Sequence, residues 1–105
     1  MGNMQSEVII VHASVPTLRA SHYLQALCKH FAHKVPARFD PSSGTVEFPF
    51  GLCLMTAEPE QLLVRCEVAS ETDLPLIREV FDDHLARFAW REDVKPVWSR
   101  DGTLI

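Results

Sequence analysis

Apolar residues dominate the first regular stretch of the chain, residues 8–13 (VIIVHA). The stretch is rich in β-branched side chains and is bounded by Ser14 and Pro16, which is typical of a β-strand. Because neighbouring side chains of a strand alternate between the two faces of a sheet, both faces of this strand would be largely apolar. We therefore expect a first strand in the interior of the sheet.

The next stretch changes to a helical period. Apolar side chains recur at i, i+3, i+4 and i+7, at Leu24, Leu27, Cys28 and Phe31. We expect Thr17 or Ser21 to cap the start of this helix. Pro36 disfavours helical geometry in the residue before it, so the helix should end near His33.

Four short segments with turn signals between them follow, which predicts an antiparallel meander. The segments cover residues 35–39, 46–50, 52–57 and 62–68. Residues 41–44 (PSSG) predict a turn, and Pro49 predicts an edge strand or a bulge. The last segment alternates most regularly, so we expect it to be a strand with one buried face.

The strongest helical pattern lies in the last third of the chain. Its apolar positions are Leu74, Ile77, Phe81, Leu85 and Phe88. Pro75 cannot donate a backbone hydrogen bond inside a helix, so Thr72 or Asp73 is a better N-cap than Ser70.

The end of the chain predicts a short strand at residues 94–98, interrupted by Pro96. We expect residues 1–6 and 99–105 to be tails around an ordered core of about residues 7–98. The order is therefore strand, helix, four strands, helix and short strand. It predicts an α+β two-layer sandwich, with two helices on one face of an antiparallel sheet, in a single domain of residues 1–105.

Composition and charge exclude several classes of protein. Apolar residues make up 47% and charged residues 23%, the balance of a globular domain. A net charge of -4 argues against sequence-independent binding of nucleic acid. The longest apolar runs are too short to span a membrane, and the first residues lack the pattern of a signal peptide, so a cytoplasmic location is expected.

The three cysteines, Cys28, Cys53 and Cys66, are an odd number without paired spacing. They fit a reducing compartment rather than a disulfide framework. Cys28 and Cys66 lie on predicted core faces, and Cys53 is expected to be buried as well. Low reactivity follows, because an apolar environment disfavours the thiolate.

Charge is distributed unevenly along the chain. Between residues 19 and 38 there are four basic residues and three histidines but no acid, whereas acids dominate residues 40–83. Such asymmetry is a hint of association, since complementary patches steer encounters. The predicted partner-binding residues are Arg19, Lys29, Lys34 and Arg38. The alternative is that two solvated faces simply differ in sign.

Histidines near the end of the first helix suggest a metal site. His30 and His33 are spaced i, i+3, and a third ligand would come from His84 or a carboxylate. Cys28 lies about 160° around the helix from His30, so it is not expected to share their ion. The alternative is that His30 and His33 complement the carboxyl end of the helix and bind its free carbonyls.

His84 falls within the apolar stripe of the second helix, where an imidazole needs partners for its nitrogens. We expect it to meet Tyr23 or a histidine of the first helix. Trp90 and Trp98 fall outside the helical stripe, and they are expected either to close the edge of the domain or to offer a contact surface.

Several stretches together resemble a known family. They are residues 22–34 with the pattern HFxHK, the turn Phe48–Gly51, and residues 84–92 with the pattern HLxRF, together with Trp98. The chain resembles, over about residues 8–98, the bacterial family called domain of unknown function 2218. The resemblance implies a small two-layer α+β domain, near the TATA-binding-protein-like arrangement. It also implies a context beside flavoproteins that resemble siderophore-interacting proteins, and it carries over no catalytic residues.

The sequence therefore predicts a cytoplasmic accessory or binding protein rather than an enzyme, linked through a siderophore-interacting flavoprotein to iron metabolism. No cofactor is predicted apart from the metal ion discussed above. A free sheet edge near Pro49 or Val97 would permit a homodimer. The alternative function is a metal- or heme-handling protein or a small enzyme that uses His30, His33 and His84.

Overall fold

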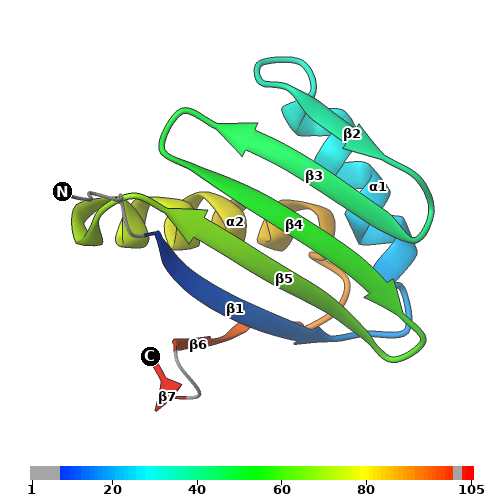
Figure 1. Ribbon diagram of the computed structural model, residues 1–105. Coiled ribbons are helices and arrows are strands. Elements are labelled where there is room, and N and C mark those ends of the chain that lie inside the picture. Colours follow the sequence, from blue (N-terminus) through cyan, green and yellow to red (C-terminus); the bar gives the residue numbers. More distant parts are fainter. Residues whose placement is uncertain (1–7, 101–102) are drawn as a thin grey trace, which may run out of the picture.

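A computed structural model describes residues 8–100 and 103–105 of the chain (Figure 1). Two α-helices and seven strands follow one another in the predicted order. The elements are β1 (Ile9–Pro16), α1 (Ala20–Phe31), β2 (Ala37–Phe39), β3 (Ser43–Phe48), β4 (Gly51–Glu58), β5 (Gln61–Val68), the 3-10 turn η1 (Glu71–Asp73), α2 (Leu74–Phe88), β6 (Val97–Arg100) and β7 (Thr103–Leu104).

All seven strands form one sheet in the order β2-β3-β4-β5-β1-β6-β7, and every pairing is antiparallel. β1 lies between β5 and β6, which confirms the interior position that its apolar pattern predicts. Figure 1 shows both helices behind the same face of the sheet. The predicted α+β two-layer class is thus confirmed, and the order is compatible with a TATA-binding-protein-like arrangement.

The core fills the space between the helices and the sheet. Its largest fully buried side chains come from both helices and from the inward positions of the strands: Tyr23, Leu24, Leu27, Ile77, Phe81 and Leu85 from α1 and α2, and Val11, Val15, Val46, Met55, Leu62 and Val64 from the sheet. The buried positions of β5 alternate with more exposed ones, as expected of a strand with one covered face.

Gly44 lets α1 approach β3 closely. A Cβ atom placed on Gly44 would lie 2.7 Å from the Sγ of Cys28 and 3.2 Å from a methyl group of Leu24. The absence of a side chain at Gly44 therefore sets how deeply Cys28 packs into the core.

Both helices begin close to their predicted starts. α1 begins at Ala20, but its N-cap is Arg19, whose backbone N–H donates to the hydroxyl of Thr17 at 3.0 Å. Ser21 does not act as the cap, because its hydroxyl donates to the carbonyl of Pro41 at 2.5 Å. α2 begins at Leu74 with Asp73 as its N-cap, one of the two residues that the sequence predicts there.

Two features of the strands differ from the sequence prediction. Pro49 lies in the turn between β3 and β4, and β3 is paired on both sides, so Pro49 marks neither an edge nor a bulge. The predicted tail at residues 99–105 contains Ser99 and Arg100 of β6 and the short strand β7. The other predicted tail, residues 1–6, lies outside the described residues.

Candidate functional site

The helices cover one face of the sheet, and the other face carries no second layer among the described residues (Figure 1). We call this surface the open face. Its side chains are those that alternate with the buried positions: Thr45 and Glu47 of β3, Leu52, Leu54 and Thr56 of β4, Leu63, Arg65 and Glu67 of β5, Ile10, His12 and Ser14 of β1, and Val97 and Ser99 of β6.

Strand register sorts the open face into rows that run across the strands. One row places Leu54 beside Arg65, Arg65 beside His12, and His12 beside Ser99. The row on one side places Thr56 beside Leu63, and the row on the other side places Leu52 beside Glu67. Basic and acidic groups therefore occupy different rows, and the rows of Arg65 and Glu67 are adjacent.

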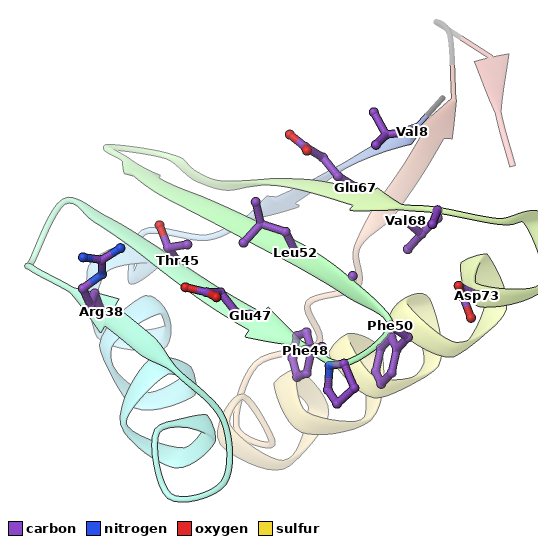
Figure 2. Close-up of a pocket in the computed structure, with 13 residues that line it drawn as sticks. Val8, Arg38, Thr45, Glu47, Phe48, Phe50, Leu52, Glu67, Val68 and Asp73 are labelled. Atoms are coloured by element: carbon purple, nitrogen blue, oxygen red, sulfur yellow. The ribbon is translucent and has the colours of Figure 1, made fainter. Parts of the chain in front are cut away.

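One end of the open face is hollowed around the turn between β3 and β4 (Figure 2). This aromatic hollow has a volume of about 590 Å³, and the rings of Phe48 and Phe50 stack there with centroids 5.2 Å apart. Its lining residues are Val8, Arg38, Thr45, Glu47, Phe48, Pro49, Phe50, Gly51, Leu52, Glu67, Val68, Ala69 and Asp73. With three acids against one arginine, the aromatic hollow is acidic.

A second hollow of about 460 Å³, the leucine hollow, lies over the middle of the sheet. Its lining residues are His12, Ala13, Ser14, Leu54, Thr56, Leu63, Val64, Arg65, Val97 and Ser99. Among these described residues there is no aspartate or glutamate. The leucine hollow thus combines aliphatic side chains, three hydroxyls and two basic groups.

An ion pair joins the two hollows, because Arg65 lines the leucine hollow and Glu67 lines the aromatic hollow. Its Nη1 lies 2.5 Å from the Oε2 of Glu67, and the two side chains are 44% and 24% exposed. An ion pair at this exposure contributes little to stability, because water and salt screen it. Arg65 also keeps further N–H donors besides the one that Glu67 accepts.

On the other side of the molecule, the imidazole ring of His84 lies 4.8 Å from that of His30, measured between centroids. The Nδ1–H of His84 donates to the carbonyl of Val80 at 2.7 Å. This confirms the expectation that His84 meets a histidine of the first helix. Partial desolvation lowers the pKa of His30, and the neighbouring His84, Arg87, His33 and Lys34 lower it further.

The structure thus brings together two of the three predicted metal ligands, His30 and His84. Within residues 8–100 and 103–105, no group of three or more His, Cys, Asp or Glu side chains is arranged to hold a metal ion. The positive charges around His30 also oppose a bound cation. The metal site of His30, His33 and His84 remains a prediction.

The four predicted partner-binding residues lie in different parts of the molecule. The guanidinium of Arg19 lies 5.7 Å from the ring centroid of Tyr23, at the start of α1. Lys29 and Lys34 are exposed at the end of α1. Arg38 is on β2 and lines the aromatic hollow. Their role in binding a partner also remains a prediction.

Two partly buried hydrogen bonds, from Tyr23 to Glu92 and from Trp98 to Asp82, join the helices to distant parts of the chain, and sequence patterns do not reveal either. The hydroxyl of Tyr23 donates to Glu92, which also accepts from Thr17 at 3.2 Å. Burial raises the pKa of Tyr23, and the hydrogen bond to Glu92 adds to this effect. The Nε1–H of Trp98 donates to Asp82 at 2.9 Å.

The two tryptophans have different environments. Trp98 is 3% exposed and packs against Phe81, whereas Trp90 is 72% exposed. The guanidinium of Arg91 lies 4.7 Å from the ring centroid of Trp90. Trp98 therefore belongs to the core, whereas Trp90 lies at the surface.

All three cysteines are buried free thiols. The Sγ atoms of Cys53 and Cys66 are 3.0 Å apart across β4 and β5. Burial raises the pKa of Cys28 to about 11. The hydrogen bond to Cys66 and burial together raise the pKa of Cys53 strongly. The predicted inward orientation of Cys28 and Cys66 is confirmed.

Comparison with known proteins identifies relatives over most of the chain. The family model described as "uncharacterized protein conserved in bacteria (DUF2218)" matches residues 12–99. The chain is 30% identical to PA4090 from Pseudomonas aeruginosa, whose structure was solved by NMR, with a TM-score of 0.72. The alignment covers 87% of this chain and 95% of that one. No curated protein matches the chain.

Within the described residues, neither helix is long and apolar enough to cross a membrane.

Proposed function

The chain belongs to the bacterial family DUF2218. We propose, from the shape of its open face, that it is a binding protein whose open face holds an apolar ligand. The observation that carries the proposal is the pair of hollows, of about 590 and 460 Å³, on the side of the sheet that the helices leave uncovered. Volumes of this size are typical of sites for small molecules.

The aliphatic side chains of the open face support ligand binding. Leu52, Leu54 and Leu63 point away from the core, on neighbouring central strands, and are still half-buried. Water in contact with such a group of side chains is unfavourable, by about 25 cal/mol for each Å² of apolar surface. A ligand that covers these leucines would recover that free energy.

Binding is better supported than catalysis by the groups present. Sites that bind small molecules combine an apolar floor with a few polar groups, as the leucine hollow does. A nucleophilic cysteine would need an accessible thiolate, but all three thiols are buried, and burial raises the pKa of Cys28 to about 11.

The neutral fluorescent dye Nile red tests this function. We expect its fluorescence to rise in the presence of the protein, and amide shifts in NMR spectra to change on β4 and β5. Leu54→Asn and Leu63→Asn should each weaken dye binding. Leu76→Asn, at an exposed leucine of α2, is the matched control. The proposal would be contradicted if Nile red changed the amide shifts of helix residues only, or changed no amide shifts at all.

We also propose, from the family resemblance, an accessory role in iron–siderophore metabolism in the cytoplasm, beside a flavoprotein of the siderophore-interacting type. The exposed side chains of Lys29 and Lys34 support an acidic partner surface. Binding to such a purified flavoprotein at low salt should weaken with Lys29→Glu or Lys34→Glu and persist with Lys95→Glu. Absence of binding at low salt would end this part of the proposal.

The second candidate function is metal or heme handling by His30, His33 and His84. It is favoured by the 4.8 Å separation of the His30 and His84 rings and by the hydrogen bond that fixes His84. Metal analysis of protein purified without a histidine tag tests it. This function would be favoured over the first if the protein contained one equivalent of metal per chain, and if His30→Ala and His84→Ala each abolished that metal content.

A further inference from the structure

We propose that the leucine hollow binds a free alkyl carboxylate of medium chain length, with Arg65 and His12 holding the carboxylate and the aliphatic side chains holding the chain. This inference rests on the proposed binding function and adds the chemical class of the ligand.

Charge selects an anionic head group. The described lining residues of the leucine hollow include one arginine and one histidine but no acid. The aromatic hollow on the same face has the opposite character, with Glu47, Glu67 and Asp73 in its lining. Glu67 pairs with Arg65 from the adjacent row but does not line the leucine hollow, so an anion is favoured over the middle of the sheet relative to the end near the turn between β3 and β4.

Register places the two basic side chains together. His12 and Arg65 are opposite one another on β1 and β5, so their Cβ atoms lie about 5 Å apart. Both belong to the open face. A guanidinium has five N–H donors in a planar fork, and Glu67 accepts from only one of its nitrogens. The remaining donors suit the two oxygens of a carboxylate, with His12 as a further donor.

The apolar part of the hollow surrounds this basic pair. Leu54 is opposite Arg65 on β4, Leu63 is two residues before Arg65 on β5, and Val97 is on β6. From β4 to β6 the sheet spans three strand spacings, or about 14 Å. This floor matches an extended alkyl chain of comparable length, such as that of decanoate.

Hydroxyl groups complete the polar part of the site. Ser14, Thr56 and Ser99 lie in the lining, and the hydroxyl of Ser14 donates to Gln61 at 2.7 Å. A hydroxyl can donate or accept a hydrogen bond. The hydroxyls can therefore donate to a bound carboxylate, directly or through a water molecule at the edge of the hollow. A quaternary amine would lack any acidic partner among these residues.

The test compares three probes that share a ten-carbon chain and differ in the head group: decanoate, decanol and decyltrimethylammonium, each below its micelle concentration. Titration calorimetry and NMR shift mapping use the full chain. We expect decanoate to bind at least about tenfold more tightly than decanol, since charge-assisted hydrogen bonds are stronger than neutral ones. Amide shifts should centre on β1, β5 and β6.

Variants at exposed positions keep the test independent of folding. Arg65→Gln and His12→Gln should each reduce decanoate affinity by about tenfold and leave decanol unchanged. Glu67→Gln breaks the ion pair of Arg65 without removing the guanidinium, so decanoate should bind as tightly or more tightly. Arg87→Gln removes a basic group from the helix side and is the control. Thermal melts show whether each variant folds.

The outcomes separate this inference from the function on which it rests. Equal affinity for decanoate and decanol would overturn the carboxylate class while leaving an apolar-ligand protein. Failure of all three probes together with Nile red would overturn both. Two further results would overturn the inference. One is that the protein binds decanoate only when decanoate has assembled into vesicles. The other is that sedimentation shows a dimer of the free protein whose contact covers the leucine hollow.

Discussion

The imidazole ring of His84 lies 4.8 Å from that of His30, which joins the middle of α2 to the last turn of α1. The hydrogen bond from His84 to Val80 fixes one partner of this pair. Phe31 packs against the His84 ring at 4.7 Å, and Phe88 packs near His30 at 5.9 Å. A change of charge at this pair therefore acts directly on the contact between the helices.

Stability should decrease in mild acid because of His30. Its pKa in the folded protein is below the ordinary histidine value of about 6.5, chiefly through partial desolvation and then through nearby basic groups. Folding thus disfavours the protonated form, and the contribution of His30 to stability is present above pH 6.5 and lost as the pH falls through the folded pKa. Urea unfolding between pH 8 and 5 should show a smaller loss for His30→Gln than for the wild type. His22→Gln is the control, and identical pH profiles for all three proteins would contradict this account.

Tyr23→Phe should destabilise the fold by about 1–2 kcal/mol, because it removes the hydrogen bond from a buried phenol to the partly buried carboxylate of Glu92. Tyr23 is 1% exposed, and its hydroxyl is the group that reaches Glu92 from α1. Denaturant unfolding measures the loss. In the Glu92→Gln background the same Tyr23→Phe change should cost less, and an equal cost in both backgrounds would show that the two residues are not coupled.

Gly44→Ala should cost about 1–3 kcal/mol, because an added Cβ overlaps the Cys28 sulfur in a packed core. The clash distance is 2.7 Å to Sγ of Cys28. The double variant with Cys28→Ala removes that sulfur and should recover part of the loss relative to Cys28→Ala alone. If the two substitutions are simply additive in thermal unfolding, Cys28 is not the source of the strain.

The thiols should be protected in the native protein. All three cysteines are buried, and burial raises the pKa of Cys28 to about 11. We expect no reaction with an aromatic disulfide reagent at pH 7 within minutes, and three reactive thiols after unfolding in guanidinium. An added exposed cysteine, Ser42→Cys, supplies the positive control. Rapid reaction of any native thiol would show that the core opens locally.

Periodicity predicts both helices and the antiparallel sheet because these depend on local spacing. Leu24, Leu27 and Phe31 repeat at helical intervals, and each is buried in α1. Pro75 shifts the predicted start of α2 to the residue that the structure shows as its N-cap, Asp73. Where local geometry decides an element, the sequence is sufficient.

The sites depend on contacts between distant parts of the chain. Tyr23 and Glu92 are 69 residues apart, and Trp98 and Asp82 meet only because β6 returns beside β1. No spacing rule connects such pairs. Asp82 beside Asp83 suggests a solvated face, yet Asp82 is bound by a buried indole, and burial raises its pKa.

Sequence patterns also do not identify the open face. Leu52 and Leu54 alternate with Cys53 and Met55, so β4 is apolar on both faces and its pattern does not tell which face the helices cover. A strand with two apolar faces favours burial on both sides, and the structure instead leaves one of them uncovered. The second apolar face of β4 is therefore the one feature of the sequence that could have pointed to the leucine hollow.

The central place of β1 has a consequence for synthesis of the chain. β1 is synthesised before both of its neighbours in the sheet, β5 and β6. Ile9 is paired with Val68, so β1 has no partner strand until the segment up to β5 has been made. Pairings over such long sequence separations slow folding. Until β5 and β6 have been made, the apolar residues of β1 lack the sheet partners that cover their backbone in the folded protein.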